Sequence, residues 1–448
     1  MPVRARFAST FLISACLVVG LFLLALPALY LLIPGVPLEP FPEQHQDAET
    51  LLYLLFFFVL FPAGIFAGPR IADRFATRHS SETADLLSAL LLGSLALAVI
   101  TVRLSDLVGV ERSLVMTGLV AAAWWVLALL LYFPGSGFVA SLAGRTDQRT
   151  VWIATAALCV LALATAVTFS GLDGPVLIGG LMVAGIVTWV WGRLTIPVLS
   201  GWKGLLFDLV LVVVFLFAVV DVPIYRIGEF AEAPMDEFLS EVQQFHAALW
   251  LAAANAIEHG RYLPVDTASQ YGVGSIYFIA GVFELIPMDY GTLSLLDAVL
   301  AALVYAMGWA IMRMAGVGRA LSAGVLLLIL PVLVWGTTYP VGGILQNGSI
   351  RFGLLPFCFI FLRMLSLWKP RWSKPFGLLA WAVVGVSAIW ALEGLLYTTG
   401  AVLGMIAVEA AVRNPGTRRS WLTGQALRFV AAWAVVHVLF AIFTLIVA

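Results

Sequence analysis

Long apolar runs recur along the whole chain, and they limit its fold more than any other feature. Each is around 20 residues long, the length that a helix needs to cross the hydrocarbon core of a bilayer. The runs begin near Phe7, Leu51, Leu86, Leu114, Val151, Val176, Gly204, Tyr271, Leu293, Ala320, Phe352, Phe376, Thr399 and Ala426. Backbone polar groups inside a bilayer have to be paired within the segment, which favours helices. The sequence therefore predicts an all-α integral membrane protein, a polytopic bundle of about 13 to 14 transmembrane helices.

Composition agrees with this class. Of 448 residues, 62% are hydrophobic and only 11% are charged, whereas soluble domains carry roughly 25% charged residues. The formal net charge of -1 leaves no basic excess for nucleic acid, which we exclude as a partner. Cys16, Cys159 and Cys358 all lie inside apolar runs, so we expect them to pack there, and we assign no residue as a metal ligand.

Loop charges predict the orientation. Arg4 and Arg6 precede the first run and place the N-terminus in the cytoplasm, because Lys and Arg concentrate on cytoplasmic loops. The alternation of basic and acidic loops holds through the seventh run and puts residues 221–270 outside. Beyond residue 271 it fails, because two full crossings before Met314 would put three basic clusters on the wrong face. The short run ending at Pro287 is the best candidate for a segment that does not cross.

The loop at residues 221–270 is the only long one that we expect. It separates an N-terminal block of about six transmembrane helices, residues 1–203, from a second block, residues 204–448. Two of the five histidines and many of the acidic residues lie in or beside this loop. We therefore expect the functional residues in or beside this loop.

The loop has the pattern of an amphipathic helix from about Asp236 to His259. Its apolar residues recur at helical spacing: Phe238, Val242, Phe245 and Leu249. Because the segment is too polar to span, we expect it to lie on the membrane surface, and Gly260 is a typical helix end. Asp236 and Glu237 would either cap the first turn or serve chemistry. His246 is either an ordinary interfacial residue or a ligand contact.

Polar residues and glycines follow this helix directly before the next apolar run. Asp266, Ser269 and Gln270 precede Tyr271-Gly-Val-Gly274. The glycines would let the backbone approach a ligand or a neighbouring helix closely. The alternative is a turn with an interfacial tyrosine.

Ionisable residues at membrane depth are candidates for function by default. Glu393, between Trp390 and Thr398, is the strongest of them. The others are Asp208, Glu284, Asp297, Glu409 and His437. The polar stretch Gln346-Asn-Gly-Ser-Ile-Arg351 offers an arginine to a phosphate, or it is a helix start capped by Asn347 or Ser349.

The surface helix, followed by His259-Gly-Arg-Tyr, Asp266 and Ser269-Gln-Tyr-Gly, resembles the first external loop of GT-C-type membrane glycosyltransferases. The match covers about residues 204–277, with weaker echoes at 346–351 and 390–398. It implies a GT-C-like core at residues 204–448 and a sugar donor linked to polyprenyl phosphate. It also implies transfer to a glycan or lipid acceptor at the external face of the plasma (inner) membrane, in contact with membrane lipid.

The resemblance also implies roles for individual residues. Asp236 is the best match to the essential acid of that loop, with Glu237 or Asp221 as alternates, and would act as general base on an acceptor hydroxyl. The implied substrate-binding residues are His246, Arg261, Asp266, Gln270, Tyr271, Arg351 and Glu393. No cofactor follows from the residues, and a divalent cation is kept as the one candidate.

Two other functions remain open. A transporter or flippase of a lipid-linked glycan would use the same intramembrane acids as a pathway without breaking a bond. Inverted internal repeats would favour transport, and the sequence shows none that is convincing. A non-catalytic membrane protein derived from a glycosyltransferase is the third interpretation.

Overall fold

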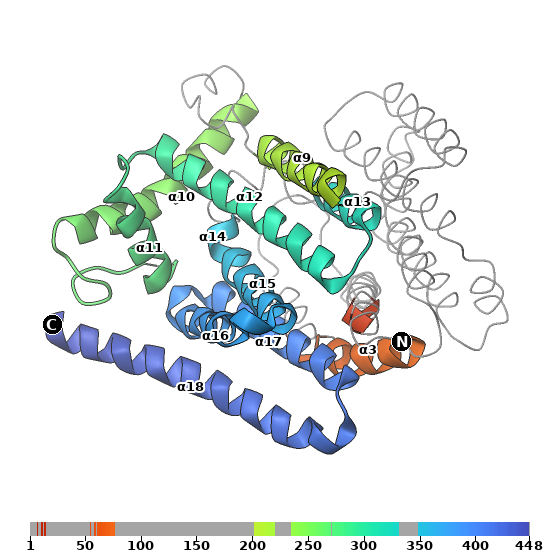
Figure 1. Cartoon of the computed structure of the whole chain (residues 1–448). Helices are drawn as coiled ribbons and strands as arrows, with labels where there is room; N and C mark the ends of the chain where they lie inside the picture. The colour runs from red at the N-terminus through yellow and green to blue at the C-terminus, as the bar shows by residue number, and fades with distance from the viewer. Residues whose placement is uncertain are drawn as a thin grey trace, which may run out of the picture. The chain divides into compact units, whose positions relative to one another are not determined.

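A computed structural model describes residues 61–76, 201–219, 234–269, 271–330 and 348–447, with isolated positions between residues 7 and 59. Every regular element in these ranges is helical (Figure 1). The helices are α3 (Phe61–Ala76), α9 (Gly201–Val219), α10 (Pro234–Glu258), α11 (Val273–Phe283), α12 (Tyr290–Ala315), α13 (Arg319–Leu330), α14 (Ser349–Phe352), α15 (Leu354–Trp368), the 3₁₀ turn η7 (Pro370–Trp372), α16 (Ser373–Trp390), α17 (Leu392–Val412) and α18 (Pro415–Val447). The prediction of an all-α chain is confirmed for these residues.

Four helices within the described ranges are long and apolar enough to cross a membrane. They are α12, the continuous stretch Pro370–Trp390, α17 and α18. These helices support the predicted membrane class. The full count of about 13 to 14 spans stays a prediction, because most of residues 1–200 lie outside the described residues.

The chain forms two compact units. The first comprises Met1–Pro197, Ala315–Pro331 and Ala407–Arg413, and the second comprises Val198–Met314, Val332–Ile406 and Asn414–Ala448. The predicted division into residues 1–203 and 204–448 stays a prediction. All residues of the candidate site described below belong to the second unit.

Helix α10 begins and ends close to its predicted bounds. It runs from Pro234 to Glu258, against a prediction of about Asp236 to His259. Gly260 follows with a φ of 77°, and the Arg261 N–H donates to the Ala256 carbonyl at 2.9 Å. The helix therefore ends at a glycine in the left-handed conformation, as the sequence predicts. Its position on the membrane surface stays a prediction.

Helix α11 has only 11 residues, and so it is about 16 Å long. The hydrocarbon core of a bilayer is roughly 30 Å thick, so α11 alone is too short to cross it. A loop joins α11 to α12. At its end, Oδ1 of Asp289 accepts a hydrogen bond from the Thr292 N–H at 2.7 Å in the first turn of α12. The length of α11 agrees with the prediction that the run ending at Pro287 does not cross, and the orientation of the loops stays a prediction.

The boundary between α16 and α17 lies two residues before the predicted interruption at Glu393 and Gly394. Helix α16 ends at Trp390, and Ala391 is extended with φ -157° and ψ 158°. Helix α17 then begins at Leu392. Glu393 is consequently in the first turn of a helix, and this placement matters for the site.

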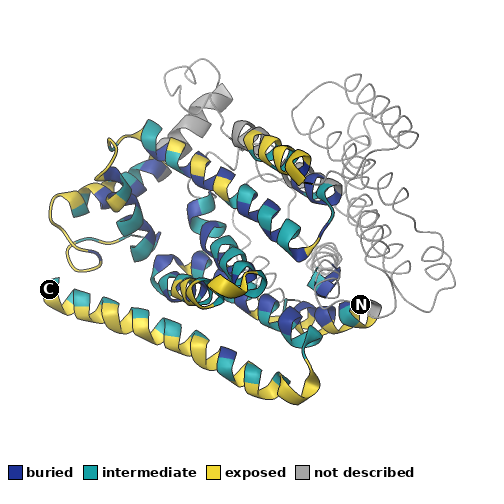
Figure 2. Ribbon diagram, viewed as in Figure 1, coloured by how far each residue is buried: buried dark blue, intermediate teal, exposed yellow. Residues whose placement is uncertain are grey.

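The helices of the second unit pack through a core of large apolar residues. Contacting pairs include α10 with α11, α11 with α16, α15 with α16, and α16 with α18. The core includes Trp250, Ile276, Ile279, Leu293, Ile350 and Trp390. Gly385 allows α18 to approach α16, because a Cβ there would lie 2.7 Å from the Ala432 carbonyl oxygen. Most of α18 outside this contact is exposed (Figure 2).

Candidate functional site

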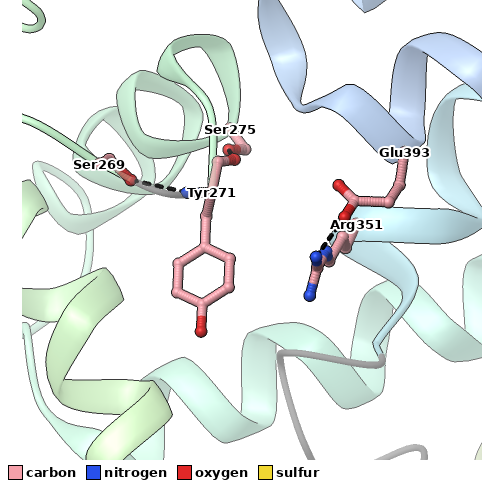
Figure 3. Close-up of polar contacts among 5 residues, drawn as sticks. All are labelled: Ser269, Tyr271, Ser275, Arg351 and Glu393. Atoms are coloured by element: carbon pink, nitrogen blue, oxygen red, sulfur yellow. Dashed lines mark hydrogen bonds and ion pairs between the residues drawn. The ribbon is translucent and has the colours of Figure 1, made fainter. Parts of the chain in front are cut away.

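Three of the predicted substrate-binding residues, Tyr271, Arg351 and Glu393, lie together in the second unit (Figure 3). Nη2 of Arg351 forms an ion pair with Oε1 of Glu393. The guanidinium carbon of Arg351 also lies 5.5 Å from the ring centre of Tyr271 and 5.2 Å from that of Phe352. A cation over aromatic faces gains electrostatic attraction without losing its charge.

Arg351 is held by a short helix that is fixed to the end of α16. It lies in α14, whose N-cap is Gly348 and whose first residue is Ser349. The indole Nε1–H of Trp390 donates to the Ile350 carbonyl at 2.7 Å. The predicted helix start is thus present, but its N-cap is Gly348 and not Ser349, which is the first residue of the helix. Asn347, the other predicted cap, lies outside the described residues.

Tyr271 is buried and held from both sides. Its ring stacks on Trp250 with a centroid distance of 4.6 Å and an interplanar angle of 10°. Its N–H donates to Ser269 Oγ at 3.1 Å, and its carbonyl accepts a hydrogen bond from Ser275 Oγ at 2.6 Å. These contacts fix the position of the Tyr271 ring beside Arg351.

The glycines after Tyr271 bring the backbone against α16. Gly272 has a φ of 87°, and a Cβ there would lie 1.7 Å from the Trp390 carbonyl oxygen. At Gly274 a Cβ would lie 3.1 Å from the Trp390 Cα. The prediction that these glycines permit a close approach to a neighbouring helix is confirmed, and the neighbour is the last turn of α16.

Glu393 lies at the start of a helix that is long enough to span. With 21 residues, α17 is about 31 Å long, close to the thickness of the hydrocarbon core. Its first turn, and with it the Arg351–Glu393 pair, would therefore lie at the level of the lipid headgroups. The two side chains are 19% and 26% exposed, respectively. The N-terminus of α17 also favours the negative charge of Glu393.

A second acid, Asp297, lies against the other end of α14 and is fully buried. Its two oxygens face the backbone amides of Ser349 and Ile350. Among the described residues neither oxygen accepts a hydrogen bond of ordinary geometry. A Cβ on Gly348 would lie 2.3 Å from Oδ2 of Asp297, so the carboxyl group occupies the space that the glycine leaves.

Two of the other predicted residues, Arg261 and Asp266, are described, and both are exposed. Arg261 lies directly after α10. Oδ2 of Asp266 accepts a hydrogen bond from the Tyr262 N–H at 2.9 Å, which closes a turn. The backbones of Asp236, Glu237 and His246 are in α10, but their side chains lie outside the described residues, as does Gln270.

No group of three or more His, Cys, Asp or Glu side chains that could hold a metal ion occurs in the part of the chain that the structure describes. The divalent cation kept as a candidate cofactor is not tested by this, because the side chains of Asp236, Glu237 and His246 are outside that part.

Sequence reasoning missed Trp250 and Ser275. Ser275 had a readable signal, since a serine one turn into a helix often donates to the carbonyl four residues before it. Trp250 had none, because its stack on Tyr271 joins two segments that no local pattern relates.

Comparison with known proteins adds no relative, since no family model, curated protein or solved structure matches the chain. The resemblance to GT-C glycosyltransferases therefore stays a proposal.

Proposed function

We propose that the protein is a membrane glycosyltransferase that transfers a sugar from a polyprenyl-phosphate donor to a glycan or lipid acceptor. The observation that carries the proposal is Arg351, a partly exposed guanidinium that lies close to the rings of both Tyr271 and Phe352. Its planar fork matches the oxygens of a phosphate group. Together with the resemblance of the preceding loop, this favours a phosphate-linked donor.

The depth of the site supports a lipid-linked phosphate. Arg351 precedes α15, Trp390 ends α16 and Glu393 is in the first turn of α17, so all three are at helix ends. Tyr and Trp are enriched at the level of the headgroups, where the phosphate of a polyprenyl lipid would also lie. A prenyl chain could then remain in the hydrocarbon region while its phosphate meets Arg351.

The sidedness supports an external site. Exposed Lys369, Arg371 and Lys374 lie at or just before the start of α16, the opposite end from Trp390. Arg413 follows the end of α17, the opposite end from Glu393. Basic residues mark the cytoplasmic ends of spanning helices. Because α11 alone is too short to cross, it does not reverse the orientation of the helices that follow it. We place the site at the external face of a plasma (inner) membrane, with the N-terminus in the cytoplasm.

In the proposed reaction an acceptor hydroxyl attacks the anomeric carbon of the sugar. A new bond forms between the acceptor oxygen and that carbon, while the bond from the carbon to the phosphate oxygen breaks. Asp236 would take the proton of the hydroxyl as general base. Arg351 would offset the charge that develops on the leaving phosphate. We prefer Arg351 to Arg261 for this role, because Arg261 is exposed, whereas Arg351 lies beside the rings of Tyr271 and Phe352.

The test is sugar transfer in proteoliposomes that contain a panel of polyprenyl-phosphate sugars and membrane acceptors. Arg351→Gln should lower transfer by at least about a hundredfold, the size of effect that removing one stabilising group produces. Asp236→Asn should lower it by about 10² to 10⁴, although asparagine caps a helix almost as well. Arg261→Gln is the matched control and should keep transfer near the wild-type level.

Full transfer in Arg351→Gln would contradict the proposal. Full transfer in Asp236→Asn would leave helix capping as the role of that residue and move the search to Glu237, Asp221 or Asp266. Binding or translocation of the lipid by the wild-type protein without any transfer would favour the transporter or flippase.

A further inference from the structure

The ion pair between Arg351 and Glu393 would limit which phosphates the proposed site retains. The pair joins one positive and one negative charge, and the rings of Tyr271 and Phe352 that face Arg351 are uncharged. A phosphate that binds to Arg351 must compete with Glu393. It must also accept a carboxylate as a near neighbour once it is bound.

Glu393 is expected to remain in the site after such a displacement. It is in the first turn of α17, where the helix N-terminus stabilises a carboxylate without help from Arg351. Tight packing also fixes this turn, because a Cβ on Gly394 would lie 3.0 Å from Cδ1 of Trp390. The backbone therefore cannot carry Glu393 far from Arg351.

The consequence is a selection by charge. A donor in which phosphate joins the lipid to the sugar is a phosphodiester with one negative charge. The lipid phosphate left after transfer is a monoester, which carries close to two negative charges above its second pKa of about 6. With Arg351 alone, the extra charge would tighten binding of the product. With Glu393 beside it, attraction to Arg351 and repulsion from Glu393 largely cancel for that extra charge.

We infer that Glu393 is a specificity-determining residue that prevents the site from favouring a dianionic phosphomonoester over a monoanionic phosphodiester. It thereby promotes release of the lipid phosphate after transfer. This inference rests on the proposed function, since it assumes that Arg351 binds the phosphate.

The test is equilibrium binding to the full chain in nanodiscs at pH 8, with two probes that differ in charge and lack a sugar. One probe is polyprenyl phosphate, and the other is its methyl ester. The wild-type protein should bind the two within about threefold of each other. Glu393→Gln should bind both more tightly and should favour the monoester by roughly tenfold, the effect of one unopposed charge at an interface between water and protein. Glu284→Gln, an exposed carboxylate at the end of α11, is the matched control and should leave the ratio unchanged.

The outcomes separate the inference from the proposed function. If Arg351→Gln leaves the binding of both probes unchanged, the proposed site is wrong. If Arg351→Gln abolishes binding while Glu393→Gln leaves the ratio unchanged or weakens both probes, only the inference is wrong, and Glu393 merely positions Arg351. If Glu393→Gln does not fold, the wild-type ratio decides, because a preference for the monoester of more than about tenfold contradicts the inference.

Discussion

Two carboxyl groups of the second unit, Glu393 and Asp297, are held in opposite ways. Glu393 is partly exposed at the start of α17 and is paired with Arg351. Asp297 is fully buried in α12, and its oxygens lie against the backbone of α14 without an ordinary hydrogen bond among the described residues. Both acids border the same four-residue helix, one at each end.

Glu393 is therefore placed to act on a ligand, whereas Asp297 stabilises the fold. Both members of the Arg351–Glu393 pair are partly exposed, so an incoming anion can reach the guanidinium and compete with the carboxylate. A buried carboxyl group packed against a glycine is fixed by shape and should tolerate little change.

The largest effect is expected on the Glu393 side, at Gly272. Gly272→Ala puts a Cβ 1.7 Å from the Trp390 carbonyl oxygen at a φ of 87°. Backbone strain and overpacking together should lower the free energy of unfolding by at least about 3 kcal/mol. Thermal unfolding in detergent measures this. Gly281→Ala, in the same α11 and with open space at its Cβ, is the control and should not destabilise the protein.

The next effect is expected on the Asp297 side, at Gly348. Gly348→Ala places a Cβ 2.3 Å from the buried Asp297 Oδ2 and should cost about 1 to 3 kcal/mol of stability. In an Asp297→Ala background the same change should cost less than about 0.5 kcal/mol, because the contact is gone. A double-mutant cycle by chemical denaturation measures the difference. Equal losses in both backgrounds would show that Asp297 does not fill this space.

A smaller effect is expected where α14 meets α16. Trp390→Phe keeps an aromatic ring but removes the Nε1–H that donates to the Ile350 carbonyl at 2.7 Å. Leaving that buried carbonyl without its partner should cost about 1 to 2 kcal/mol. Because α14 carries Arg351, the variant should also weaken the binding of polyprenyl phosphate. Unchanged binding with lowered stability would mean that Arg351 is positioned without this hydrogen bond.

The smallest effect is expected at Asp266, which belongs neither to the Arg351–Glu393 pair nor to the surroundings of Asp297. Its carboxylate closes an exposed turn by accepting from the Tyr262 N–H, so Asp266→Ala should cost less than about 1 kcal/mol. We expect sugar transfer to be retained. A large loss of transfer at nearly unchanged stability would instead give Asp266 the substrate-binding role that the family resemblance implies.

Helices were the most predictable part, because the bilayer and helical periodicity act locally. Apolar runs predicted the four helices of spanning length in the described part of the chain, and the pattern before Gly260 predicted α10 to within two residues. The glycines after Tyr271 correctly predicted a close backbone approach. The break between α16 and α17 lies at Ala391, two residues before the predicted position at Glu393. Alanine does not by itself favour an extended backbone, so the sequence did not indicate a break there.

Partners distant in sequence were not predictable. Arg351 and Glu393 were each predicted as substrate contacts, but nothing in their local sequence pairs them. The packing of Asp297 on Gly348 was equally hidden, because a glycine before a helix start has many explanations. The side chains of Asp236 and Glu237 lie outside the described residues, so their catalytic role stays a prediction.

The central claim is that Arg351 binds the phosphate of a polyprenyl lipid. It is tested most directly by an experimental structure of the protein in nanodiscs with polyprenyl phosphate bound. The account predicts phosphate oxygens within about 3 Å of the Arg351 guanidinium, with the Tyr271 ring beside it and Glu393 displaced from the ion pair. A phosphate bound elsewhere in the protein, with the Arg351–Glu393 pair intact, would contradict it.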